Sequence, residues 1–204
     1  LGTSLPPTGL MLARNLRAIA VDDGVESPSE SALRFAVVDL PQGFVLTRHW
    51  RDTPAGTEVE FWLATDSGPR RIRLPHQPSV AFIPADQREQ AEALLRDEKN
   101  VELKPLALQD FDHRPVLGLY CRQHGQLMRL ETALRRAGVE VYEADVRPPV
   151  RYMMERFITA PVRFGGTPGA DGLLLDAQMK PDPDYRPSLK LVSLDIETTA
   201  QAEL

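Results

Sequence analysis

The 204-residue sequence has few residues of several types, and each shortage excludes a class of protein or a mode of binding. It contains one cysteine, Cys121, which excludes an internal disulfide and fits a reducing cytoplasm. We expect its thiol to be a small buried apolar group. No apolar stretch is long enough to span a membrane. The net charge of −5 excludes binding of nucleic acid through bulk positive charge, so such binding would need local basic patches or metal-bridged phosphates.

Familiar catalytic and cofactor motifs are also missing. The four histidines are too scattered to have the spacing of metal ligands; they are His49, His76, His113 and His124. There is no nucleophile elbow, P-loop or Rossmann glycine set. The glycine-rich stretch 165–172 joins two predicted strands rather than opening a helix, so we interpret it as a loop.

What the sequence does contain is enough apolar residues for a packed core, 42% of the chain, in one or two domains. Residues 1–42 are interrupted by prolines and rich in acids, and they predict a flexible or non-homologous extension. Regular patterning begins at Gly43. Four short strands, 44–50, 59–63, 71–74 and 79–83, predict an antiparallel meander, with residues 51–56 as the first loop.

Helices and further strands follow the meander. Asp86–Arg96 predicts a helix, with Asp86 as N-cap and Glu89 completing a capping box. The strongest helix signal covers Gln123–Ala137 and ends at Gly138. Pro148 opens a third helix whose apolar face is predicted as Val150, Met153, Met154 and Phe157. Strands are expected at 101–103, 116–120 and 139–142, with a hairpin of 161–164 and 173–177 and a linker over 180–187. The fold class is therefore mixed α/β (α+β).

The stretch Leu191–Glu197 carries the clearest chemical pattern. Its apolar run predicts a buried strand, and side chains alternate along a strand, so Asp195 and Glu197 would point to the same side. Hard cations such as Mg²⁺ or Mn²⁺ would relieve the repulsion between the two carboxylates. Two metals about 4 Å apart can clamp the attacking and leaving oxygens of a phosphodiester. The triplet alone is equally compatible with two solvated acids at a strand end.

Two arginine clusters and several aromatic residues are candidates for contact with nucleic acid. The clusters are Arg70, Arg71 and Arg73, on a probable edge strand, and Arg147, Arg151 and Arg156, on or beside the third helix. Ordinary solvated charges explain each cluster equally well. The aromatic side chains that could stack on bases are Trp50, Trp62, Tyr120 and Tyr142, for most of which core packing is the alternative.

Residues 193–199, Ser-Leu-Asp-Ile-Glu-Thr-Thr, resemble the first exonuclease motif of the family B DNA polymerases. The segments 43–64, 117–122 and 141–158 are also similar to this family, so the resemblance runs from about Gly43 to Leu204. It implies an amino-terminal polymerase domain over 43–186 and the start of a ribonuclease-H-like 3′–5′ exonuclease domain over 187–204. In that domain Asp195 would bridge two divalent metals, and Glu197 would bind one and help orient the attacking water.

The resemblance further implies an enzyme of DNA replication and repair, located in the cytoplasm on the nucleoid. Its partners would be the template single strand and the primer 3′ end, and a sliding clamp would be bound through parts beyond these 204 residues. Because the later exonuclease motifs and the polymerase palm are not in this sequence, we expect the chain alone neither to polymerise nor to proofread. The alternatives are a stand-alone two-metal nuclease and a non-catalytic module that binds single-stranded nucleic acid.

Overall fold

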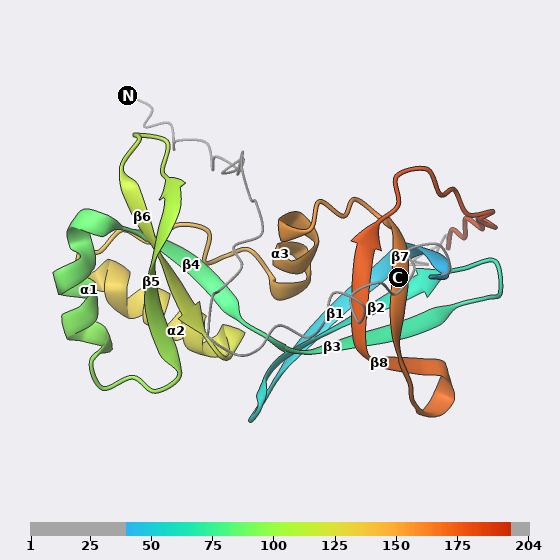
Figure 1. Ribbon diagram of the computed structural model, residues 1–204, viewed down its shortest axis with the longest axis horizontal. Helices are drawn as coiled ribbons and strands as arrows, with labels where there is room; N and C mark the ends of the chain where they lie inside the picture. The colour runs from blue at the N-terminus through green and yellow to red at the C-terminus, as the bar shows by residue number, and fades with distance from the viewer. Residues whose placement is uncertain (1–39, 197–204) are drawn as a thin grey trace, which may run out of the picture.

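The computed structural model describes residues 40–196, which form two lobes with separate hydrophobic cores (Figure 1). One core fills a β-barrel, and the other belongs to an α/β unit inserted between the third and fourth barrel strands. The predicted extension over 1–42 lies outside the described residues except for its last three. The mixed α/β fold class is confirmed.

Five strands close the barrel in the order β1-β2-β3-β8-β7. They are β1 (Gln42–Thr53), β2 (Gly56–Ala64), β3 (Arg70–Gln77), β7 (Pro161–Pro168) and β8 (Leu173–Pro181), with a short 3₁₀ turn η2 (Ala170–Gly172) before the last. All pairings are antiparallel except β3 with β8, which is parallel and spans only two residue pairs. This connectivity is that of the OB-fold, a small barrel used for oligonucleotides and oligosaccharides.

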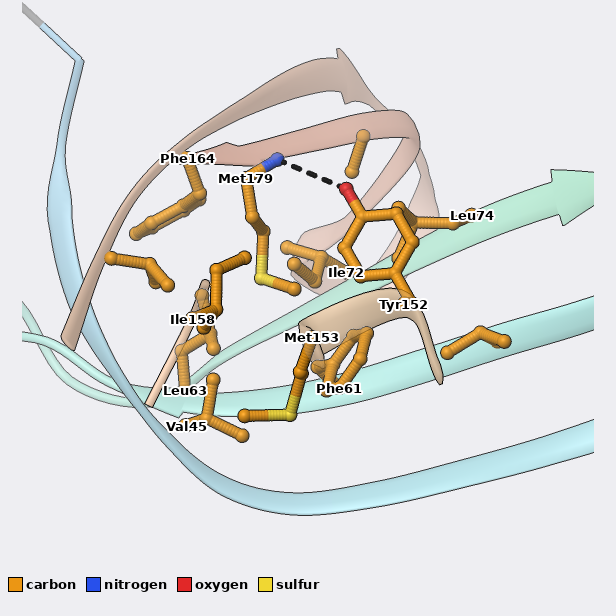
Figure 2. Close-up of a cluster of buried hydrophobic side chains, with 13 residues drawn as sticks. Val45, Phe61, Leu63, Ile72, Leu74, Tyr152, Met153, Ile158, Phe164 and Met179 are labelled. Atoms are coloured by element: carbon orange, nitrogen blue, oxygen red, sulfur yellow. Dashed lines mark hydrogen bonds between the residues drawn. The ribbon is translucent and has the colours of Figure 1, made fainter. Parts of the chain in front are cut away.

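Alternation of side chains explains how the barrel fills. In β2 the residues Val59, Phe61 and Leu63 are completely buried, while the intervening residues face outward. Helix α3 (Pro148–Glu155) closes the barrel with Tyr152 and Met153, as Figure 2 shows. Burying each large side chain contributes about 1.5–3 kcal/mol to stability. The Met179 N–H donates to the Tyr152 hydroxyl at 3.4 Å, so the polar end of the tyrosine ring also has a partner in the core.

The apolar face predicted for α3 is only partly correct. Met153 is buried, but the helix ends at Glu155, and Phe157 lies beyond it with a left-handed φ of 55° and 66% exposed. Arg151 and Tyr152 are buried although neither belongs to the predicted face. The reason is that α3 packs against the barrel on one side and contacts the inserted unit on another, so a single apolar stripe does not describe it.

The inserted unit, residues 79–142, forms a three-stranded sheet in the order β4-β6-β5 with helices α1 and α2 on one face. Its elements are β4 (Ser79–Pro84), the 3₁₀ turn η1 (Ala85–Gln87), α1 (Arg88–Leu95), β5 (Val101–Gln109), β6 (Pro115–Cys121) and α2 (His124–Arg136). An isolated antiparallel β-bridge between Phe82 and Tyr142 places Tyr142 beside β4, where a fourth strand of the sheet would lie. The order resembles the ferredoxin-like arrangement.

Several local predictions need correction. The meander has three strands, because β4 leaves it to pair with β6 in the other lobe. The segment 139–142 makes one bridge instead of a strand. The loop predicted over 51–56 shrinks to the turn at Pro54 and Ala55, because both strands continue almost to the tip of the hairpin. Gly138, by contrast, ends α2 as predicted, with φ of +85°.

The predicted cap of the first helix is also wrong. Asp86 lies in η1, and α1 begins at Arg88 without a side-chain capping hydrogen bond. The 3₁₀ turn carries the chain from the end of β4 into the helix, which shifts the helix start past Asp86 and leaves the Asp86–Glu89 pair out of register for a capping box.

Two sets of contacts join the barrel to the inserted unit. At the tip of the β1–β2 hairpin, the Asp52 carboxylate accepts hydrogen bonds from the backbone N–H groups of His124 (3.0 Å) and Gly125 (2.7 Å) and from the Thr57 hydroxyl (2.6 Å). Asp52 thereby satisfies the first turn of α2 from a distant part of the chain. Near α3, Arg151 pairs with Glu143 at 2.8 Å and lies over the Phe82 ring at 5.4 Å.

The predicted strand at 191–197 is not formed in the part of it that the structure describes. Residues 191–196 have no strand pairing, and their four apolar side chains are 80% exposed or more. A strand needs a neighbouring strand for its backbone hydrogen bonds, and none of the described strands pairs with this segment. Within the described residues, no helix combines the length and the apolar character needed to cross a membrane.

Candidate nucleic-acid interface

The outward side chains of β1, β2 and β3 form an ordered surface, which we call the outer face. Strand register aligns them in rungs: Thr47, Trp62 and Arg71 in one, and His49, Glu60 and Arg73 in the next. Arg51 and Glu58 face each other beside them. In an OB-fold this side of strands two and three is the surface on which oligonucleotides lie.

The first rung has the chemistry for stacking a base. Trp62 is 38% exposed, and the Arg71 guanidinium carbon lies 5.6 Å from the centre of its ring. No carboxylate of the described residues lies within 4.0 Å of Arg71, and its Nε has no hydrogen-bond partner there. A flat aromatic ring beside an uncompensated cation can hold a base and its phosphate together.

The remaining cations of the outer face are already paired. Arg51 contacts Glu58 at 2.7 Å, and Arg73 contacts Glu60 at 3.1 Å. They border a hollow of about 200 Å³ lined by His49, Trp50, Arg51, Glu58, Glu60 and Arg73. Since the two glutamates compete with any incoming phosphate, these rungs offer polar contacts but little net positive charge.

The first predicted arginine cluster is divided by the structure. β3 is flanked by β2 and β8 in a closed barrel, so its assignment to an edge strand is wrong. Arg70 donates to the Ser67 hydroxyl and the Pro69 carbonyl, and Arg73 is bound to Glu60. Arg71 alone of the three stands beside an exposed aromatic ring.

The second cluster is also divided. Arg151 is buried and bound to Glu143, which excludes it from phosphate contact in this conformation. The Arg156 guanidinium lies 3.8 Å from the centre of the Tyr152 ring at the end of α3. Arg147 is exposed, and its guanidinium lies 5.7 Å from the centre of the Trp50 ring.

Of the four candidate aromatic residues, the two tryptophans remain accessible. Tyr142 is held in a polar network, where it donates to Glu140 and accepts from Arg114 at 2.7 Å. Partial burial and the bond to Glu140 raise the pKa of Tyr142 to about 12. Tyr120 is half-buried beneath Lys104, whose ammonium lies 5.5 Å from the ring centre. These tyrosines therefore serve the structure of the inserted unit.

The larger surface hollow, about 470 Å³, lies elsewhere, between residues 97–100 and the start of α2. Its arginine, Arg129, donates from its two terminal nitrogens, Nη1 and Nη2, to the Glu98 carboxylate at 2.8 and 3.0 Å. Gln126 donates to the Lys99 carbonyl at 2.8 Å. Arg129 and Gln126 are thus already engaged by protein partners, and the other charged groups of the lining, Asp97 and Lys99, are of opposite sign.

The structure does not assemble a metal site around Asp195. Asp195 is exposed in the irregular segment 191–196, and Glu197 lies outside the described residues. Residues 40–196 contain no group of three histidine, cysteine, aspartate or glutamate side chains placed to hold a metal ion. The residues described here therefore do not by themselves fit the two-metal site that the sequence pattern predicts.

Comparison with known proteins matches both lobes. Residues 43–78 match the family model for the N-terminal domain of DNA polymerase II, and residues 79–139 match the model for its insertion domain. The boundary at 78/79 falls between β3 and β4, where the chain leaves the barrel. DNA polymerase II of Escherichia coli strain K12 is 62% identical over 162 residues, which are 79% of this chain and 21% of that protein.

A solved structure shows the same fold. The family B DNA polymerase of the hyperthermophilic archaeon Pyrobaculum calidifontis superposes with a TM-score of 0.58 at 20% identity, over 72% of this chain and 21% of that one. The barrel with its α/β insertion thus has the fold of the amino-terminal part of this family B DNA polymerase. Its two lobes match the N-terminal and insertion domains of DNA polymerase II. The chain spans about a fifth of the length of both relatives.

Sequence reasoning missed the outer face as a unit. It identified Trp62 and Arg71 separately, without their pairing across neighbouring strands. The signal was present in the alternation of β2, where Glu58, Glu60 and Trp62 interleave with the core residues. What the alternation could not give is the partner of each outward residue, because that depends on strand register.

Proposed function

We propose that this chain is the amino-terminal, DNA-contacting part of a DNA-directed DNA polymerase that also carries a 3′–5′ proofreading exonuclease and acts in DNA replication and repair. The observation that supports this most strongly is the 62% identity to a DNA polymerase over 162 residues. A cytoplasmic location on the nucleoid is part of the proposal, as is a sliding clamp bound through other parts of the full enzyme.

Within that role the barrel binds single-stranded template on its outer face. A base stacks on Trp62, and the Arg71 guanidinium holds a neighbouring phosphate. Because the other outer-face arginines are paired with glutamates, binding is weak and depends on few phosphates. The same surface supports the second candidate function, a non-catalytic module for single-stranded nucleic acid.

Titration of the chain with a fluorescent oligothymidylate at two salt concentrations tests the binding. We expect binding that weakens as salt rises, and Arg71→Gln should weaken it further and reduce the salt slope by about one. The matched control is Arg136→Gln, an exposed arginine in the last turn of α2 with no carboxylate partner among the described residues. Unchanged binding by the Arg71 variant would contradict the outer-face assignment.

For the exonuclease we propose domain boundaries at 42/43 and 186/187, with Asp195 and Glu197 as metal ligands in the full enzyme. Their carboxylates are suited to Mg²⁺ or Mn²⁺. The exposed position of Asp195, away from other described ligands, supports the proposal that this chain alone does not proofread. That it does not polymerise is the companion proposal.

A 5′-labelled single strand incubated with the chain and Mg²⁺ tests the exonuclease proposal. We expect no shortening above the level of the Asp195→Ala variant. Metal-dependent 3′–5′ digestion that the substitution abolishes would show that these 204 residues form a complete nuclease, and would overturn the proposal.

A further inference from the structure

The second tryptophan, Trp50, lies on the opposite face of the β1–β2 hairpin from Trp62. Thr47 is the register partner of Trp62, and Trp50 follows Thr47 by three residues, which places the two indole rings on different faces. Trp50 is one of the two tryptophans in the chain, and 37% of its surface is exposed. An aromatic ring of this size left partly open has a large apolar surface to offer a ligand.

Three separate elements surround this ring. It projects from β1, the His124 ring of α2 meets it edge-on with centres 6.0 Å apart, and Arg147 approaches from the segment before α3. The hairpin tip is fixed to α2 by the Asp52 bonds and by Gln123, whose side chain donates to the Thr53 carbonyl at 2.6 Å. The angle between hairpin and helix is therefore held in place before any ligand arrives.

The charge around Trp50 favours an anion. Arg48 lies on the same face two residues earlier, and neither Arg48 nor Arg147 has a carboxylate within 4.0 Å among the described residues. Asp52, on the same face two residues further along β1, has its oxygens engaged by three hydrogen-bond donors. Trp50 therefore has two guanidinium groups near it that lack a carboxylate partner, whereas Trp62 has one, Arg71. Both surroundings suit a stacked base and its phosphate.

The hairpin also leaves a path between its two faces. β1 pairs with β7 only through Gln42, Gly43 and Phe44, so the outer edge of β1 beyond these residues has no strand neighbour. A single strand that crosses this edge can pass from the Trp62 face to the Trp50 face. The backbone N–H groups along such an edge are donors that suit phosphate oxygens.

We propose that Trp50 is a second stacking site for an unpaired base of single-stranded DNA, with Arg147 and Arg48 binding the phosphates beside it. The site is separate from the Trp62 and Arg71 site, and this inference rests on the proposed function of the barrel in binding single strands. One strand then contacts both faces of the hairpin.

The two tryptophans allow each site to be followed separately. In Trp62→Phe all indole emission comes from Trp50, and in Trp50→Phe it comes from Trp62. On titration with a 16-nucleotide oligothymidylate we expect both variants to show quenching, with midpoints within about twofold of each other. Arg147→Gln should weaken binding and lower the salt slope by about one, whereas Arg136→Gln should not.

A second measurement distinguishes stacking of a base on Trp50 from an indirect change in Trp50 fluorescence caused by movement between the hairpin and α2. With an oligonucleotide carrying 5-iodouracil, irradiation should crosslink Trp50, identified by mass spectrometry of the digested complex. Quenching and crosslinking at Trp62 without either at Trp50 would overturn this inference and leave the proposed function intact. No binding at either tryptophan, confirmed by fluorescence anisotropy, would overturn both.

Discussion

At the scale of single residues, the expected local cap of α1 is absent, whereas α2 is capped by a side chain far away in the sequence. The sequence favours Asp86 as a helix cap, yet Asp86 forms no capping bond. Asp52, which no sequence signal places near a helix, accepts two N–H groups of α2. Burial alone would raise the pKa of the Asp52 carboxyl, but the bonds from Thr57, Gly125 and His124 outweigh burial and lower it.

This contrast predicts different costs for two aspartates. Asp52→Ala should lower the free energy of unfolding by about 1–2 kcal/mol, because it removes the cap of α2 and loosens the joint between the lobes. Asp86→Ala should change it by no more than about 0.5 kcal/mol. Urea denaturation followed by circular dichroism measures both. Equal losses would show that the cap that Asp52 provides for α2 contributes no more to the free energy of unfolding than Asp86 does.

The single cysteine illustrates burial at the same scale. Cys121 is 1% exposed in the core of the inserted unit, as its apolar context predicted. Burial, assisted by the nearby Glu98 carboxylate, raises the pKa of the thiol to about 12. The reactive thiolate is therefore scarce at neutral and mildly alkaline pH.

We expect the native chain to react with a disulfide reagent at pH 8 at least roughly a hundredfold more slowly than the urea-unfolded chain. The double variant Cys121→Ala, Ser67→Cys places the thiol in the exposed turn before β3 and should react at once. Rapid labelling of native Cys121 would mean that the sheet opens at β6 far more often than its burial implies.

At the scale of elements, α3 shows why a helix cannot be interpreted from one face. It closes the barrel through Tyr152 and Met153, and it also carries Arg151 into a buried pair with Glu143 beneath the inserted unit. Both partners are about nine-tenths buried, and Glu143 adopts a left-handed φ of 56°. A pattern search finds the apolar residues of such a helix but misses its buried charge.

Breaking this pair should be costly. Arg151→Met leaves the Glu143 carboxylate buried without a cation, and we expect a loss of about 3–5 kcal/mol. The double variant Glu143→Gln, Arg151→Met removes both charges and should recover at least half of that loss. Denaturant unfolding of both variants and of Glu143→Gln completes the cycle. Strictly additive losses would show that the two side chains act independently.

At the scale of the whole molecule, the described residues divide into a stable two-lobed body and an exposed end. The barrel and the inserted unit each have a core, and the joints at Asp52 and Arg151 connect them. The four apolar side chains of residues 191–196 belong to neither core, since they are 80% exposed or more.

Replacing Leu191, Val192, Leu194 and Ile196 together by serine should therefore leave the free energy of unfolding within about 0.5 kcal/mol of the original. Leu63→Ala, in the barrel core, should by comparison cost about 2–5 kcal/mol. Thermal and urea unfolding of both variants provide the measurement. A large loss in the quadruple variant would place this segment against the body.

The sequence by itself determined the mixed α/β class, most strand and helix positions, the resemblance to the family B DNA polymerases and the carboxylate pattern at Asp195–Glu197. These follow from alternation, helical periodicity and motif, which are local properties of the chain. Only the tertiary structure decided that β4 leaves the meander, that five strands close a barrel, that Arg151 is buried, and that both tryptophans flank one hairpin. The physical reason is that pairing and burial depend on contacts between segments far apart in the chain, as between Asp52 and α2, and the order of residues alone leaves those contacts open.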